Sequence, residues 1–263
     1  MDLKMAVNGT DTTDYNARLL SRTIGLGTVT VYDDWLKNAM NPLYFGDQVT
    51  YKTIKLSFLI KDMNDNSALT DISNLVSAMR KCTIEFGDMD YLYDCVLQET
   101  GEPTKSILDG RFKLDVTLKA AYAYLPAVSK SYTVTFDGNK DKSISVNIQG
   151  NLPVPIVLEA EIISADSDQN FKFNVPSNVD TSTNGWLKNC FIIRPLYKNM
   201  TLTVDSEKCL VYEGDIIPGN AYSIFWGDFV TLQPGSNSVP VGLESLNGTV
   251  EIQLTIKYKP RFI

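Results

Sequence analysis

The chain has 263 residues, of which 44% are hydrophobic and 21% are charged, and its formal net charge is −7. This length accommodates two domains of ordinary size, while the negative charge disfavours binding to the phosphate backbone of nucleic acids. No apolar run approaches the roughly 18 residues of a membrane-spanning helix. No apolar segment typical of a signal peptide follows the first residues, so we expect a protein that is made and kept, or assembled, in a cytoplasm.

The residue types of the commonest catalytic and metal sites are missing or unsuitably spaced. The sequence contains no histidine, which argues against Ser-His-Asp and Cys-His nucleophile systems and against histidine-ligated metals. Its four cysteines form no CxxC pair, so an all-cysteine zinc site is not expected either. We therefore predict that the protein is not an enzyme and has no catalytic, cofactor-binding or metal-binding residues.

Three short segments imitate binding loops but lack essential positions. Residues 25–30 begin like a dinucleotide-binding loop, yet a strand is expected where the phosphate would need a helix N-terminus. Residues 62–66 carry oxygen-bearing side chains at alternating positions, but the glycine and the closing glutamate of a calcium loop are absent. Residues 166–170 fail in the same way, so both of these segments are predicted to be turns.

In the first half of the chain, the alternation of apolar and polar side chains predicts several β-strands. The expected strands cover residues 5–7, 15–21, 26–32, 54–60 and 111–121. Residues 33–48 show little periodicity and carry several large apolar side chains, so we expect a long ordered loop or arm there. These side chains are Trp35, Pro42, Tyr44 and Phe45.

Residues 67–97 are predicted to form an amphipathic helix followed by a tight hairpin. Asn66 or Ser67 is expected to cap the helix, because a short side-chain oxygen can accept hydrogen bonds from the first free N–H groups. Apolar side chains at helical spacing predict one buried face. That face consists of Leu69, Ile72, Leu75, Val76 and Met79.

The register of the hairpin follows from the period-two rule for strands. A slip by one residue would bury its polar side chains, which fixes the register. The pairs expected to face each other are Phe86 with Tyr91, Ile84 with Tyr93, and Cys82 with Cys95. Because no secretion signal is present, the two cysteines are expected to be free buried thiols.

Periodicity stops near the middle of the chain, and we place the domain boundary between residues 1–128 and 129–263. The second half is predicted to contain only strands and turns, at intervals typical of a sandwich or jelly roll. The sequence Asp-Gly-Asn-Lys at 137–140 predicts a hairpin turn between strands at 132–136 and 143–148.

Two further interpretations of the second half stay open. Trp186 and Trp226 are candidates for a sugar-stacking surface, although tryptophan in a β-sandwich more often lies in the core. Glu159 and Glu161 point the same way on one expected strand and would be the carboxylate pair of a glycosidase. Acidic side chains on a solvated strand face are far commoner than such a pair.

Four groups of residues occur in a characteristic order along nearly the whole chain. They are 7–10 (VNGT) with 15–18 (YNAR) and Trp35; 54–58 (IKLSF) leading into 72–75 (ISNL) and 91–93 (YLY); 151–155 (NLPVP); and 232–237 (LQPGSN) with 260–262 (PRF). In this order they resemble the distal tail proteins of long-tailed, non-contractile bacteriophages (siphoviruses).

The resemblance implies a mainly β fold. It implies an N-terminal β-sandwich-like ring domain with one α-helix and a hairpin, and a C-terminal galectin-like β-sandwich. The implied function is a structural hub of the phage tail tip or baseplate, in which six copies form a ring. The ring joins the tail tube protein to the tail-tip protein and anchors adhesion components such as a receptor-binding protein. Candidate subunit contacts are then Trp35, Pro42, Tyr44 and Phe45.

The resemblance also implies a location in the virion, at the tail tip, after assembly in the host cytoplasm. The net charge adds the hypothesis that DNA passes through a negative bore without specific binding. The alternative function is a soluble lectin-like protein that forms no ring and binds carbohydrate through Trp186 and Trp226. Neither function requires membrane insertion.

Overall fold

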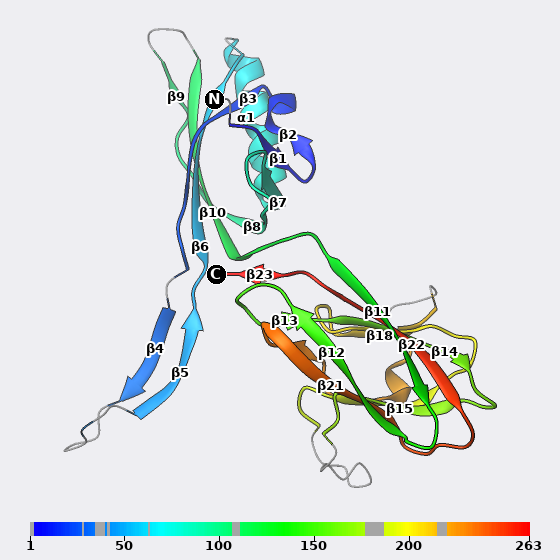
Figure 1. Ribbon diagram of the computed structural model, residues 1–263. Helices are drawn as coiled ribbons and strands as arrows, with labels where there is room; N and C mark the ends of the chain where they lie inside the picture. Colours follow the sequence, from blue (N-terminus) through cyan, green and yellow to red (C-terminus); the bar gives the residue numbers. More distant parts are fainter. Residues whose placement is uncertain are drawn as a thin grey trace. The chain divides into compact units, whose positions relative to one another are not determined.

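The structure, a computed structural model, describes residues 3–27, 29–34, 40, 43–62, 64–106, 111–176, 187–214 and 220–263. Strands dominate these residues and one α-helix occurs among them, which confirms the mainly β fold class (Figure 1). The chain divides into two compact units, Met1–Pro126 with Phe262–Ile263, and Ala127–Arg261. The division falls after residue 126, near the expected boundary after residue 128, and the assignment of the two units as domains stays a prediction.

The first unit is built on a curved sheet. Its strands are β1 (Met5–Val7), β2 (Thr10–Asp11), β3 (Ala17–Ile24), β6 (Lys52–Ile60), β7 (Lys81–Phe86), β8 (Leu92–Thr100), β9 (Thr104–Lys105), β10 (Phe112–Tyr124) and β23 (Arg261–Phe262). They run in the order β2-β1-β7-β8-β10-β6-β3, and β9 and β23 also pair with β10. An antiparallel bridge joins Leu3, just before β1, to Leu19 in β3, so the sheet curls until its two ends meet.

The helix α1 (Asp65–Met79) covers the core of this unit. Ala68, Leu75 and Met79 are completely buried in it. The expectation that Leu69 is buried was wrong, because 50% of this residue is exposed. Successive helical residues are rotated by about 100°, so a buried stripe through Ala68 and Ile72 turns Leu69 towards solvent.

The cap of α1 lies earlier than the sequence suggested. The side-chain oxygen of Asn64 accepts hydrogen bonds from the backbone N–H groups of Asn66 (3.0 Å) and Ser67 (3.3 Å). Asn64 is extended, with φ −76° and ψ 122°, as an N-cap residue must be. Asn66 and Ser67 are therefore the residues that are capped.

The hairpin register expected from the sequence is confirmed. Ile84 pairs with Tyr93, and Cys82 pairs with Cys95, in the antiparallel ladder of β7 and β8. All four side chains are buried. The helix and this hairpin form a compact element because the apolar face of the hairpin belongs to the same core as α1.

Arg22 ties β3 to the tip of this hairpin. Its two terminal nitrogens each donate to one oxygen of Asp88 at 2.6 Å. Its guanidinium also lies over the ring of Phe86, 4.4 Å from the centroid. This forked contact fixes the hairpin across the curl of the sheet.

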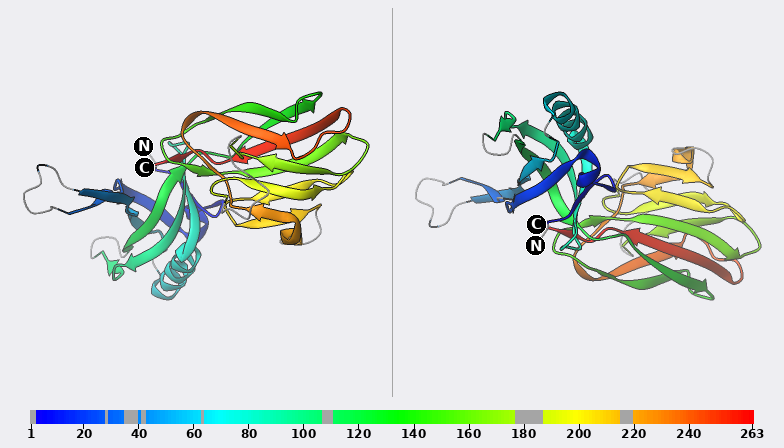
Figure 2. Two further views of the ribbon diagram at one scale, coloured as in Figure 1. Left: turned by 90° about the horizontal axis from the view of Figure 1, so that it is seen from below. Right: turned by 90° about the horizontal axis from the view of Figure 1, so that it is seen from above.

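The second unit is a two-sheet sandwich with a shared core (Figure 2). One sheet has the order β11 (Val128–Phe136), β22 (Val250–Tyr258), β14 (Val157–Ser164), β17 (Leu202–Asp205) and β18 (Leu210–Glu213). The other has the order β12 (Asp141–Ile148), β21 (Gly235–Leu243), β15 (Gln169–Phe173), β16 (Phe191–Leu196) and β19 (Phe225–Gly227). Two short strands of this unit, β13 (Val154–Pro155) and β20 (Thr231–Leu232), pair with each other outside the two sheets. A short 3-10 helix, η2 (Tyr222–Ile224), also lies in this unit, whereas η1 (Thr12–Tyr15) lies in the first unit.

The hairpin predicted around residues 137–140 was wrong. Strand β11 pairs with β22, whereas β12 pairs with β21 in the opposite sheet. Gly138 has φ +67°, and the side chain of Asn139 accepts from the amide of Asp141 at 3.0 Å. These residues do form a turn, but it carries the chain from one layer of the sandwich to the other. Buried and exposed side chains alternate along β11 and β12 because each strand buries one face in the same core.

The burial pattern of α1 predicts opposite outcomes for two leucines. Leu75→Ala should destabilise the protein by about 2–5 kcal/mol, because it leaves a cavity in the core. Leu69→Ala, on the exposed face of the same helix, should change stability by less than about 0.5 kcal/mol. Urea unfolding followed by circular dichroism measures both. Equal losses would contradict the observed orientation of the helix.

Candidate functional site on an exposed arm and a polar sheet face

The first candidate surface is an arm formed by β4 (Val29–Asp34) and β5 (Leu43–Val49), which, among the described strands, pair only with each other. Their ladder continues the register of β3 and β6. Ile24 pairs with Ile54, and Val29 pairs with Val49 five residues further along both strands. Between them the amide of Gly25 donates to the carbonyl of Thr53 at 2.8 Å. Within the segment expected to be a long ordered loop or arm, residues 33–34 and 43–48 therefore belong to a paired β-ribbon.

Large apolar side chains are exposed along this arm. Tyr44 is 62% exposed and Phe45 is 68% exposed. Val29, Val31 and Tyr32 are each about half exposed. Such a concentration of apolar surface on a two-stranded ribbon is typical of a binding interface.

Phe45 lies at a β-bulge in the arm. Tyr32 pairs with Gly46 and Asp33 pairs with Tyr44, so Phe45 is the extra residue between two ladder pairs. Bulges bend a strand and change the direction of a side chain. Of the four residues predicted to contact another subunit, Tyr44 and Phe45 therefore lie on the arm with large exposed areas. Trp35 and Pro42 lie outside the described residues.

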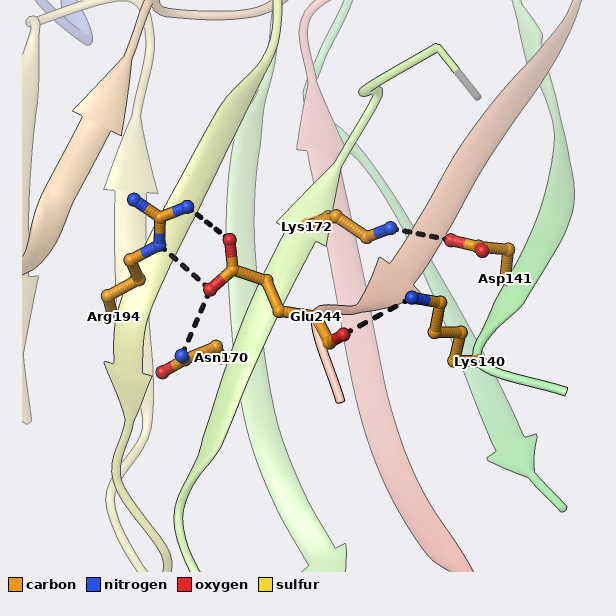
Figure 3. Close-up of polar contacts among 6 residues, drawn as sticks. All are labelled: Lys140, Asp141, Asn170, Lys172, Arg194 and Glu244. Atoms are coloured by element: carbon orange, nitrogen blue, oxygen red, sulfur yellow. Dashed lines mark hydrogen bonds and ion pairs between the residues drawn. The ribbon is translucent and has the colours of Figure 1, made fainter. Parts of the chain in front are cut away.

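The second candidate surface is the outer face of the sheet that contains β15 and β16. Cross-strand pairs place five residues in one row, namely Asp141, Gly242, Lys172, Ile192 and Trp226. The Nζ of Lys172 lies 2.7 Å from Oδ1 of Asp141, so this ion pair passes over the intervening strand (Figure 3). A side chain at Gly242 would lie 2.6 Å from that carboxylate oxygen and 2.9 Å from Cε of Lys172. Glycine at this position leaves room for the ion pair.

The next row is centred on the carboxylate of Glu244. Nε of Arg194 donates to Glu244 at 2.8 Å, a terminal nitrogen of Arg194 donates to its other oxygen, and Asn170 donates at 3.0 Å. Lys140 donates to the carbonyl of Glu244 at 3.3 Å (Figure 3). The hydrogen bonds from Arg194 lower the pKa of Glu244, and those to Glu244 raise the pKa of Arg194. Arg194, Glu244, Asn170 and Lys140 thus form a network of hydrogen bonds with one ion pair, which we call the polar lattice.

Trp226 lies on the edge strand of this sheet. It is 49% exposed, so it does not belong to the core in which tryptophan more often lies. A hollow of about 770 Å³ lies at the turn after β11 and the loop after β21, with a mostly polar lining that includes Asn139, Ser245 and Thr249. Hydroxyl-rich ligands suit a surface of this composition. Trp186, the other tryptophan predicted to contact sugar, lies outside the described residues.

The two glutamates considered for a glycosidase share one face of β14. Glu161 is exposed, and Glu159 forms an ion pair with Lys257 on the neighbouring strand β22. Neither residue lies in the row of Arg194 and Glu244.

Among the described residues, no group of three or more acidic or cysteine side chains is arranged to hold a metal ion. No described helix has the length and apolar character needed to span a membrane.

Sequence reasoning missed the polar lattice around Glu244. Its residues come from different strands and from the turn before β12, so no spacing in the sequence connects them. The available signal was a single charged residue inside an apolar strand, Arg194 in Phe191–Leu196. Such a residue needs a partner when the strand is half buried, but the sequence does not say which partner.

The described residues thus form a curved sheet unit with one helix and an arm, and a sandwich unit. No protein-family model and no curated protein matches the sequence. Among solved structures, the chain is similar to the Dit protein of phage SPP1, with a TM-score of 0.72, 11% sequence identity and 100% of both chains covered. That protein is described as a paradigm of the hub adsorption apparatus in phages that infect Gram-positive bacteria.

A chain of the phage P2 baseplate, in its activated conformation with calcium, is also similar. It has a TM-score of 0.50 and 11% identity, with 100% of this chain and 99% of that chain covered. The resemblance to distal tail proteins expected from the sequence is thus confirmed at the level of the fold. Because the identities are low, these similarities show the fold and do not show the function.

The Arg194–Glu244 pair predicts a contribution to acid sensitivity. Because folding lowers the pKa of Glu244, its stabilisation is present above the ordinary glutamate pKa and is lost as pH falls through the lowered value. Glu244→Gln should cost roughly 1–3 kcal/mol at neutral pH and should make stability less dependent on pH in the acid range. Thermal midpoints between about pH 3 and pH 7 measure this.

Glu161→Gln supplies the matched control, because it makes the same chemical change at an exposed position. Its midpoints should follow those of the unmodified protein. An equal effect of both substitutions would show that the lattice has no special role.

Proposed function

We propose that the protein is a structural hub of a phage tail tip or baseplate. Six copies form a ring through their first units, and the ring joins the tail tube protein to the tail-tip protein. The observation that carries this proposal is the fold, which is shared with the SPP1 hub protein over the full length of both chains. The expected place of the protein is the tail of the virion, after assembly in the host cytoplasm.

The exposed arm supports the formation of a ring. A two-stranded ribbon with exposed aromatic side chains gains stability only when another surface covers it. In a closed ring every copy both offers an arm and receives one, so no apolar surface is left over. Tyr44 and Phe45 are the described residues that we assign to this contact, and Trp35 and Pro42 are proposed to extend it.

The second units are proposed to lie outside the ring and to anchor adhesion components, including a receptor-binding protein. No catalytic step is assigned to the hub. The formal charge of −7 per chain favours a bore through which DNA passes without binding, because like charges repel along the passage. A map of the electrostatic potential of an assembled ring tests this idea, and a basic bore would refute it.

A lectin-like protein is the second candidate function, favoured by one observation. Trp226 is half exposed on the edge strand β19, and an exposed aromatic ring suits stacking against a sugar ring. Glycan-array binding by the full chain, lost on Trp226→Ala, would support it. Binding by a monomer that never forms a ring would favour this function over the hub.

The arm predicts how the assembly responds to mutation. Tyr44→Ser combined with Phe45→Ser should weaken association at least tenfold, because two aromatic anchors of the interface are removed. The thermal midpoint of the dissociated chain should change little, since neither side chain is buried within one copy. Light scattering after size exclusion, over a range of concentrations, measures the mass.

Ile163→Ser is the control for this experiment. Ile163 is 48% exposed on β14 of the second unit, so the change removes exposed apolar surface away from the arm. It should leave the mass of the assembly unchanged. A ring that survives the double substitution in the arm would contradict the proposed contact.

A further inference from the structure

Two free cysteines face each other across the hairpin of the first unit. Cys82 and Cys95 are direct partners in the ladder of β7 and β8, and both thiols are free and buried, with 5% and 1% exposure. Directly opposed side chains in an antiparallel ladder lie on the same face of the sheet. The two sulfur atoms therefore belong to the same small region of the core.

The ladder places the Cα atoms of these residues at a separation found for disulfides. The amide of Leu97 donates to the carbonyl of Arg80 at 3.2 Å, which makes that pair hydrogen-bonded. Hydrogen-bonded pairs recur at every second position, so Cys82 and Cys95 form another, with Cα atoms about 5.5 Å apart. Disulfides span Cα separations of about 4.4–6.8 Å.

The intervening pair agrees with this alternation. The amide of Thr83 turns away from β8 and donates to the side chain of Asn8 at 2.9 Å. The carbonyl of Thr83 accepts from the amide of Asn8 at 2.8 Å. The backbone N–H and C=O of Thr83 thus face β1 rather than β8, as the pattern requires between two hydrogen-bonded pairs of the β7–β8 ladder.

A hollow of about 380 Å³ lies over the hairpin, and its lining includes Asn8, Thr83 and Asp94. Side chains alternate between the two faces of a strand, so Thr83 and Asp94 face away from the two thiols, which belong to the core. A reagent therefore reaches the thiols when the hairpin opens locally. Burial raises the pKa of the Cys82 thiol to about 11 and also raises the pKa of Cys95. Both groups are therefore protonated and slow to react near neutral pH.

We propose that Cys82 and Cys95 form a reversible cross-strand disulfide when the assembled protein moves from a reducing to an oxidising environment. The bond joins β7 to β8 beneath the last turn of α1, where the thiol of Cys82 donates to the carbonyl of Met79 at 3.6 Å. The timing rests on the proposed function, since a tail protein is assembled in a cytoplasm and acts outside the cell. The bond itself depends only on the geometry of the hairpin.

The oxidant is a small-molecule disulfide such as oxidised glutathione. The thiolate of Cys82, the less buried of the two, attacks one sulfur of the reagent and releases one glutathione thiolate. The thiolate of Cys95 then attacks the Cys82 sulfur of the mixed disulfide and releases the second. One S–S bond breaks and one forms, and the two protons of the protein thiols pass to the two glutathione molecules.

The test uses the full chain with Cys190→Ala and Cys209→Ser, so that Cys82 and Cys95 are the remaining thiols. The folded protein is incubated with oxidised glutathione, its remaining thiols are alkylated after unfolding, and digested peptides are weighed. We expect a linked pair of peptides containing Cys82 and Cys95, a loss of two hydrogen atoms in mass, and restoration of both thiols by dithiothreitol. The thermal midpoint should rise by about 5–10 °C, because the bond closes a short loop.

The same chain with Cys95→Ala is the control, since it forms no internal bond and its midpoint should not rise. Alkylation of both thiols in the folded sample, or addition of glutathione without linkage, would overturn the proposal. A bond that forms only in the unfolded chain would overturn it as well. A bond that leaves the midpoint unchanged would overturn its role as a clamp.

Failure of this inference is distinguishable from failure of the proposed function. A ring whose cysteines stay reduced refutes the disulfide and leaves the hub intact. A linked hairpin in a chain that stays monomeric refutes the hub and leaves the disulfide intact.

Discussion

Unpaired backbone groups at the edge of a β-sheet need partners, and this need shapes both units of the protein. In the first unit the sheet curls until Leu3 meets Leu19, and α1 fills the interior that the curl creates. In the second unit two sheets share a core, and the turn at 137–140 carries the chain from one to the other. The arm of β4 and β5 follows a different course, because within one copy its strands pair only with each other.

This difference connects the fold with the proposed assembly. The arm is a direct extension of the ladder of β3 and β6, so its direction is set by a sheet that is itself held by Arg22 and Asp88. A rigid base with an apolar end is suited to reach a neighbouring copy.

Polar interactions have a different role in each unit. In the second unit, the guanidinium of Arg194 donates to the carboxylate of Glu244 on the face of a sheet. In the first unit, the hairpin holds two thiols in register within the core. We propose that the first arrangement serves as a surface for a ligand or partner, and that the second forms a bond that can be made and broken.

Local periodicity was sufficient to predict the helix, the register of Ile84 with Tyr93, and the many strands of the second half. These features depend on neighbours within a few residues, and burial of one face imposes their period. The same reasoning placed Leu69 on the wrong face of α1 and chose the wrong cap, because one residue of rotation or offset is decided by the surface against which a helix packs. From the sequence alone, the absence of histidine also argued against histidine-based nucleophile systems and histidine-ligated metal sites.

The tertiary structure decided everything that depends on distant partners. Whether β11 pairs with β12 or with β22 depends on layers that the turn sequence cannot encode, since a turn between two sheets and a hairpin turn use the same residues. The row of Asp141, Lys172 and Trp226 comes from separate strands, so it exists only when the sheet is assembled. The arm, too, became a paired ribbon because its register continues that of β3 and β6, and this is a property of the fold rather than of residues 33–48 taken alone.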